Sequence, residues 1–140
     1  MIFLAALGLR FLYLYESSDQ PTFHTPIVDA ETYNLQAIQV ATGLGLSREH
    51  FWQPIFYPLY LAGVYFCTGT SLWAPKILQA IVGAGTCVLT YRLGRDTINS
   101  EVGVLAGLIT VLCGPLIFFD GELLATSWAC FWAMLLLQQL

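Results

Sequence analysis

The sequence is dominated by long apolar stretches that are almost free of charge. Residues 102–119 run for 18 residues without Asp, Glu, Lys or Arg, and residues 72–91 form a second stretch of 20. A run of this length can cross a bilayer as a helix that satisfies its own backbone hydrogen bonds. Only 10% of the residues are charged and 57% are hydrophobic, unlike a soluble domain. We therefore expect an all-α, polytopic transmembrane helical protein, with further spans at about residues 1–15 and 123–140.

The basic residues orient these predicted spans. A stretch at residues 54–67 is only 14 residues long, which suits an interfacial segment better than a crossing. If it does not cross, Arg92 and Arg95 lie in the cytoplasm, as the positive-inside rule favours. Residues 16–71 then form a long outer loop with two helices at the membrane surface, at about 30–42 and 54–67. The third span, which follows Arg95, emerges on the same outer side as this loop.

Composition argues against nucleic acid as a partner and against a cysteine metal site, and it restricts where Arg10 can lie. The net charge is −4 with five Lys and Arg residues in all, so no basic stripe is present for nucleic acid. The four cysteines stand singly in apolar runs, which is typical of small hydrophobic residues rather than metal ligands. Arg10 lies inside the first apolar stretch, where a charge exposed to hydrocarbon is costly. We expect Arg10 to face other helices.

Asp29 and Glu31 open the first predicted surface helix. A carboxylate beside the membrane can take a proton from an incoming hydroxyl, and partial burial raises its pKa toward the range of a general base. The alternative is structural: Asp29 caps the helix and Glu31 complements its dipole. Both residues are candidates for a catalytic role.

Asp120 and Glu122 form a second acidic pair at the outer end of the third span. If the topology holds, these carboxylates face the same compartment as Asp29 and Glu31. Oxygen ligands of this kind suit a divalent metal ion, Mg²⁺ or Mn²⁺, so Asp120 and Glu122 are candidate metal ligands. The alternative is an ordinary polar turn in which one acid caps a helix.

Three further residues are candidates for substrate binding. Gln53 lies in an aromatic segment, residues 50–58, that also suits a membrane interface with proline starting a helix. Lys76 lies at the outer mouth of its span, where it could pair with a phosphate or extend to the interface. His24 lies in the outer loop, and its alternative is a loop residue without a role in binding.

Four motifs in this order resemble the N-terminal part of bacterial GT-C type membrane glycosyltransferases of family 39. These enzymes are similar to protein O-mannosyltransferases and to the lipid A aminoarabinose transferase. The motifs are Asp-Ala-Glu-Thr-Tyr from residue 29, Phe-Trp-Gln-Pro-x-x-Tyr-Pro-Leu-Tyr from residue 51, Leu-Gln-Ala-Ile-Val-Gly from residue 78 with the following Tyr-Arg-Leu-Gly-Arg, and Gly-Pro-Leu-Ile-Phe-Phe-Asp-Gly-Glu-Leu-Leu from residue 114. The resemblance covers nearly the whole chain. Family members commonly have Pro-Pro after the Gln, where this chain has Pro54 and Ile55.

The resemblance implies a function and a location. Such an enzyme moves a sugar from a polyprenyl-phosphate donor to a lipid, glycan or protein acceptor, on the outer face of the plasma membrane. It assigns activation of the acceptor to Asp29, with Glu31 beside it, and a second acidic role to Asp120 or Glu122. Family members are several hundred residues long, so this chain is expected to be a fragment that is inactive alone.

Two alternative functions remain open. The chain could belong to a membrane transporter, because Arg10 and acids at span ends also mark ion pathways. It could also be a membrane subunit without chemistry, in which case Asp29 and Glu122 tolerate alanine.

Overall fold

The computed structural model describes residues 1–45 and 54–140, and every regular element in these ranges is an α-helix. The predicted all-α class is therefore confirmed. Eight helices are seen: α1 (Ile2–Ser17), α2 (Pro21–His24), α3 (Asp29–Ala41), α4 (Phe56–Thr68), α5 (Trp73–Thr97), α6 (Ser100–Val111), α7 (Gly114–Gly121) and α8 (Thr126–Leu137).

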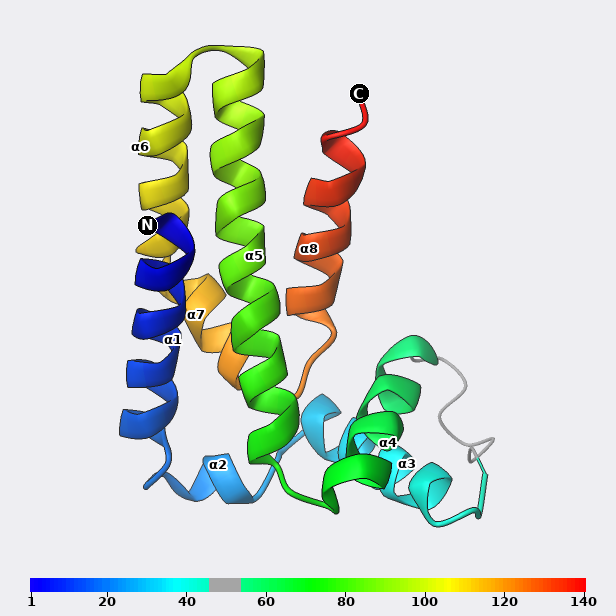
Figure 1. The fold of residues 1–140 in the computed structure, drawn as a ribbon. Coiled ribbons are helices and arrows are strands. Elements are labelled where there is room, and N and C mark those ends of the chain that lie inside the picture. Colours follow the sequence, from blue (N-terminus) through cyan, green and yellow to red (C-terminus); the bar gives the residue numbers. More distant parts are fainter. Residues whose placement is uncertain (46–53) are drawn as a thin grey trace.

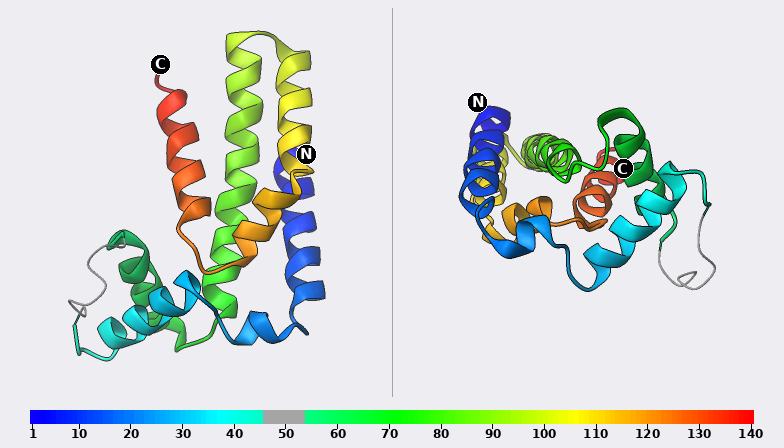
Figure 2. Two further views of the ribbon diagram at one scale, coloured as in Figure 1. Left: turned by 180° about the vertical axis from the view of Figure 1, so that it is seen from behind. Right: turned by 90° about the horizontal axis from the view of Figure 1, so that it is seen from below.

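The long helices run side by side, and α5 is at their centre. It packs against α1, α6, α7 and α8, and it forms an antiparallel hairpin with α6 (Figure 1). Helices α2, α3 and α4 lie together at one end of this bundle, whereas the α5–α6 turn lies at the other end, as Figure 2 shows from behind. The two segments that carry the acidic pairs, the start of α3 and the C-terminal end of α7, are therefore at one end, and Arg92 and Arg95 of α5 are toward the opposite end.

Glycines allow the α5–α6 hairpin to close tightly. A Cβ on Gly103 would lie 2.7 Å from the carbonyl oxygen of Tyr91 and 2.8 Å from the backbone nitrogen of Arg95. A Cβ on Gly94 would likewise lie 3.0 Å from the Cα of Gly103. Helix backbones can approach this closely only where side chains are absent, which is a common feature of helix pairs in membranes.

One described helix, α5, is long and apolar enough to cross a membrane, and α6 with α7 would be a second if the bent pair is one span. α8 is a shorter apolar helix. Large apolar side chains are nevertheless exposed on the outside of the bundle. They include Leu4, Leu12, Leu105, Ile109, Trp132 and Leu136.

The third predicted span is not one straight helix, so that expectation is wrong in detail. Residues 102–119 are divided between α6 and α7, which meet at an angle of 51°. The cause is Pro115, which occupies the first turn of α7. Proline has no amide N–H to continue the α6 hydrogen-bond ladder, and its ring is well placed only where a new helix starts.

The other predicted ranges differ less from the observed helices. α3 and α4 occupy nearly the ranges 30–42 and 54–67 given for the two surface helices. The N-cap of α3 is Val28, so Asp29 is the first helical residue rather than the cap. The one-turn helix α2 was not predicted, although Pro21 at its start is a helix-initiating signal.

Candidate active site

A cleft of about 360 Å³ opens where α3 meets the α7–α8 connection. Most of its wall is apolar, and its two acidic side chains come from different parts of the chain: Asp29 from the start of α3 and Glu122 from the end of α7. The lining residues are Thr22, Ile27, Val28, Asp29, Ala30, Phe118, Glu122 and Leu124. A concave, mainly apolar site with a few convergent polar groups is the usual form of a small-molecule site.

Asp29 is held in the cleft by a strained backbone. Val28, the residue before it, has φ 54° and ψ −123°, and it is the only residue other than glycine with a positive φ in the part of the chain that the structure describes. For a β-branched side chain this conformation is a true outlier and costs about 1–3 kcal/mol. Strain of this kind persists where surrounding packing fixes the backbone. That packing comes from Ala30, Tyr33 and Ala37, which bury the inner face of α3.

The location of Asp29 suits an anion. It lies in the first turn of α3, where the helix macrodipole is positive and favours a carboxylate. The Asp29 side chain is exposed and so can meet a substrate entering the cleft. Glu31 lies in the same turn and is also exposed, but it does not line the cleft. Residues two apart on a helix point in different directions, so the predicted acidic pair is divided.

Glu122 lines the same cleft from the segment that follows α7. It is the C-cap of α7 and is half-buried. Burial raises the pKa of its carboxyl group, and the nearby positive charge of Lys76 opposes that rise. Its backbone is also fixed, because the side-chain Nε2 of Gln79 donates a hydrogen bond of 2.6 Å to the Glu122 carbonyl oxygen. Glu122 therefore combines a fixed backbone with a side chain that reaches into the site.

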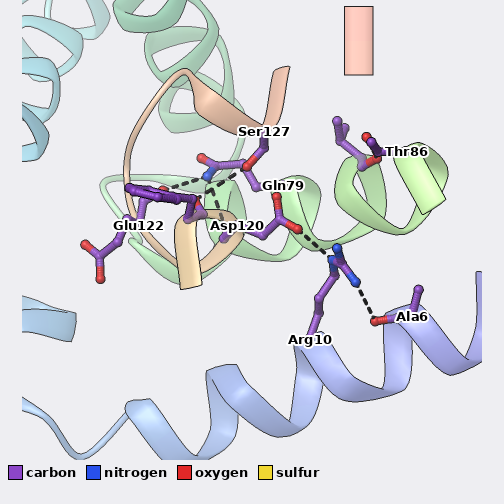
Figure 3. A network of polar contacts seen from close by, with 9 residues as sticks. Ala6, Arg10, Gln79, Thr86, Asp120, Glu122 and Ser127 are labelled. Atoms are coloured by element: carbon purple, nitrogen blue, oxygen red, sulfur yellow. Dashed lines mark hydrogen bonds and ion pairs between the residues drawn. The ribbon is translucent and has the colours of Figure 1, made fainter. Parts of the chain in front are cut away.

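Asp120 has different surroundings, although it is only two residues away. It is 4% exposed, and its Oδ2 accepts a hydrogen bond of 2.6 Å from Nε of Arg10 in a buried ion pair. Arg10 also donates to the carbonyl oxygen of Ala6 at 3.2 Å. Figure 3 shows the Asp120 carboxylate directed at Arg10, whereas the Glu122 carboxylate points away from this pair. The expectation that Arg10 faces other helices is confirmed.

The donor set does not fit the predicted metal site. The carboxylate of Asp120 is neutralised by Arg10, and the Glu122 side chain is directed elsewhere. Among the described residues, no group of three or more His, Cys, Asp and Glu side chains could hold a metal ion. The carboxylates of Asp120 and Glu122 therefore do not converge as ligands of one ion.

Of the predicted substrate-binding residues that the structure describes, Lys76 and His24, neither lines the cleft. Lys76 is 2% exposed, its Nζ donates to the carbonyl oxygen of Phe23 at 3.2 Å, and the same atom lies 3.6 Å from the centre of the Phe23 ring. The Lys76 ammonium thus ties α5 to α2 and acts on the site through its charge. His24 is exposed at the end of α2, where its Nε2 is 3.0 Å from the carbonyl oxygen of Ser18. Gln53 lies outside the described residues.

Comparisons with known proteins identify no relative of this chain. No family model matches the chain, and neither the curated proteins nor the solved structures contain a match. The family resemblance thus remains a hypothesis carried by the motifs themselves.

Two buried residues that support the site without lining the cleft were not predicted from the sequence. Gln79 is completely buried, and its side chain contacts both α4 and the α7–α8 connection. Its partner is Tyr57, which is also completely buried. The signal was present, because a lone amide in the apolar stretch 72–91 must find partners inside the protein. Which partners it finds depends on tertiary packing.

Proposed function

We propose that this chain forms the outer-face catalytic end of a membrane glycosyltransferase. Its reaction would move a sugar from a polyprenyl-phosphate donor to a hydroxyl group of a lipid, glycan or protein acceptor. The observation that carries the proposal is the cleft in which Asp29 and Glu122 meet across mainly apolar walls. An apolar wall suits a substrate with a lipid chain, and separate carboxylates suit a reaction that must handle both an acceptor proton and a sugar.

In this mechanism Asp29 is the general base. It accepts the proton of the acceptor hydroxyl as the oxygen forms a bond to the anomeric carbon, and the bond from that carbon to the phosphate oxygen breaks. The lipid phosphate leaves with the electron pair. The family resemblance implies a single displacement on the face opposite the phosphate, which inverts the configuration at the anomeric carbon. Exposure of Asp29 at the cleft allows an acceptor to approach. The strained residue Val28 immediately before it sets the direction in which the backbone enters α3.

Glu122 and Lys76 take supporting roles. As a lining residue of the cleft, Glu122 has a carboxylate that can accept hydrogen bonds from sugar hydroxyl groups. Lys76 lies close enough to influence the Glu122 carboxyl electrostatically. Its positive charge offsets part of the negative charge that the departing phosphate brings into the site. Such fixed charge is most effective in a site from which water is excluded.

The proposed setting is the plasma membrane, crossed several times. The bundle of α1, α5, α6–α7 and α8 would lie in the lipid, with its exposed apolar side chains against acyl chains. Helices α2, α3 and α4 would lie at the outer surface, and the α5–α6 turn would lie on the cytoplasmic side together with the C-terminal end of α5, which carries Arg92 and Arg95. The cleft then opens toward the periplasmic or extracellular face.

The test is sugar transfer by the full-length protein in membranes, measured with a radiolabelled polyprenyl-phosphate sugar. We expect Asp29→Asn to lower transfer by a factor of roughly 10²–10⁴, the range for loss of a general base. Asp19→Asn is the matched control, because it removes an exposed carboxylate of the same outer segment that does not line the cleft. Glu31→Gln tests whether Glu31, rather than Asp29, is the general base. Full activity in Asp29→Asn would contradict the assignment of Asp29.

A transporter is the second candidate, because a buried ion pair joins Arg10 of α1 to Asp120 of α7 inside the bundle. Charges inside a membrane domain frequently mark ion pathways. This reading predicts solute or ion flux in proteoliposomes that depends on Arg10 and Asp120 and is indifferent to Asp29→Asn. Flux of that kind, with no transfer from any lipid-phosphate sugar, would favour the transporter.

A further inference from the structure

Gln79 joins three separate segments through one side-chain amide. Its Oε1 accepts a hydrogen bond of 2.5 Å from the hydroxyl of Tyr57 in α4. Its Nε2 donates to the carbonyl oxygen of Glu122 at 2.6 Å and to that of Asp120 at 3.3 Å. Figure 3 shows the Gln79 amide beside the turn that carries Asp120 and Glu122. A single residue of α5 therefore holds the second acidic segment of the cleft on one side and α4 on the other.

Burying a side-chain amide inside the bundle costs free energy unless its polar atoms form hydrogen bonds. Gln79 is 0% exposed, so each polar atom that it brings into the bundle must be satisfied internally. Both of its polar atoms are satisfied, and their partners come from elements that are far apart in sequence. An apolar side chain of similar size would pack the same space without that cost. What only the amide provides is a fixed geometry between its partners.

The same contacts continue from Tyr57 to the helix that carries Asp29. The ring of Tyr57 packs against that of Tyr33 in α3, with centroids 5.1 Å apart. A second tie between α3 and α4 is the hydrogen bond of 2.6 Å from the Tyr65 hydroxyl to Oδ1 of Asn34. α3 is therefore fixed to α4, and α4 to Gln79. Gln79 stands at the junction between the Asp29 side and the Glu122 side of the cleft.

We propose that Gln79 is a positioning residue that sets the separation of Asp29 and Glu122 across the cleft. The geometric part follows from the contacts above, whereas its consequence for catalysis rests on the proposed function. The competing explanation is that Gln79 only stabilises the bundle. The two explanations differ in what a substitution moves: a positioning residue changes the relation of the two walls, and a merely stabilising one lowers the amount of folded protein.

The first test measures distance in the full-length protein in membranes. Spin labels are placed on α3 at Leu35 and on α7 at Phe118, both exposed, with the four cysteines replaced by alanine. We expect Gln79→Met to shift or broaden the distribution of distances between these labels. The control pair is Leu105 on α6 and Trp132 on α8, whose distribution stays unchanged if the bundle is intact.

The matched control variant is Gln138→Met. Gln138 is also a glutamine whose Nε2 donates to a backbone carbonyl of α5, that of Leu89 at 3.0 Å, but it lies just after α8 and away from the cleft. We expect Gln138→Met to leave the α3–α7 distance unchanged. If Gln138→Met broadens that distance as much as Gln79→Met does, or if neither variant alters it, the positioning role is overturned.

The second test measures sugar transfer by unlabelled protein. We expect Gln79→Met to lower kcat by about 10²-fold, the cost of misplacing a catalytic group by about 1 Å, with KM for the donor within about twofold. Tyr57→Phe removes only the donor to Gln79 and should give a smaller fall in the same direction. Tyr57→Phe also serves if Gln79→Met fails to fold, because it keeps the contacts of Gln79 to Glu122. An unchanged kcat in a variant whose distance has shifted would overturn the catalytic consequence.

Failure of the proposed function gives a different result. If the wild-type protein transfers no sugar from any lipid-phosphate donor, the glycosyltransferase proposal fails, while the distances between labels still decide whether Gln79 positions the two walls of the cleft.

Discussion

The buried pair of Arg10 and Asp120 makes the sharpest prediction about stability. The two residues are 110 positions apart in the chain and are 1% and 4% exposed. They meet against Gly83 of α5, where a Cβ would lie 2.7 Å from Nε of Arg10 and closer still to the Asp120 carboxylate. The pair thus links α1 and α7 across a helix that leaves space for it. Asp120→Asn keeps the size and shape of the side chain and removes only its charge.

The expected cost follows from burial and distance. Two unit charges about 4 Å apart interact by about 4 kcal/mol at an effective dielectric constant of about 20. Removing one partner of a buried pair also leaves the other charge without compensation, and such changes cost about 3–5 kcal/mol. The asparagine oxygen can still accept from Arg10, so we expect a loss of about 3 kcal/mol in the free energy of unfolding. Replacing both residues, in Arg10→Met with Asp120→Leu, should restore most of this loss.

The assay is equilibrium unfolding of the purified protein in mixed micelles, followed by tryptophan fluorescence. Asp96→Asn is the matched control: its carboxylate lies 2.7 Å from Nε of Arg95, nearly the distance of the buried pair, but both side chains are about half exposed. Solvent screens such a pair, so its loss should leave the stability unchanged. If Asp120→Asn costs no more than Asp96→Asn, the reasoning from burial is refuted.

Two further predictions use the same unfolding assay. Gly103→Ala places a methyl group against the backbone of Tyr91 and Arg95 and should destabilise the α5–α6 hairpin by about 1–3 kcal/mol, whereas no loss would show that the hairpin can open at no cost. Glu122 has a raised pKa because of burial, so its protonated form is favoured in the folded state. As the pH rises through its titration range the unfolded chain loses the proton first, and the free energy of unfolding falls until the folded group has ionised too. Glu122→Gln should remove that part of the slope, which begins near the ordinary glutamate pKa of about 4.3 and extends above it, and an unchanged slope would contradict burial as the cause.

The sequence predicted most of the helices, and it predicted that the candidate acidic residues lie at helix ends. Apolar runs are bounded by polar residues and turns, so their limits gave α3, α4 and the start of α5 to within two residues. The predicted end of α5 at residue 91 was wrong, because the helix continues through Arg92 and Arg95 to Thr97. The break between α6 and α7 was missed because hydropathy is continuous through residues 102–119, although Pro115 was visible. Arg10 was correctly expected to face other helices, because a single charge in an apolar stretch has no stable place in lipid.

The roles of individual polar residues were harder to predict, because they depend on partners that are distant in the chain. Asp120 was expected to bind a metal together with Glu122, but it is paired with Arg10 instead. Lys76 was placed correctly at the end of its helix. From the sequence, its ammonium group was expected to be able to bind a phosphate. The packing of α2 shows that this group instead donates to the carbonyl oxygen of Phe23 and lies over the Phe23 ring.

Asp120 and Glu122, at the C-terminal end of α7, have different surroundings and therefore different roles. The Asp120 side chain is held by Arg10 from α1, and the carbonyl oxygens of both Asp120 and Glu122 are held by Gln79 from α5. Between them Gly121 is buried, and a Cβ there would lie 2.6 Å from the ring of Tyr13, so the turn cannot shift toward α1. With its backbone fixed on both sides, this turn leaves the Glu122 side chain as the acid directed into the cleft. Changes at Asp120 should therefore act first on stability, and changes at Glu122 first on the site.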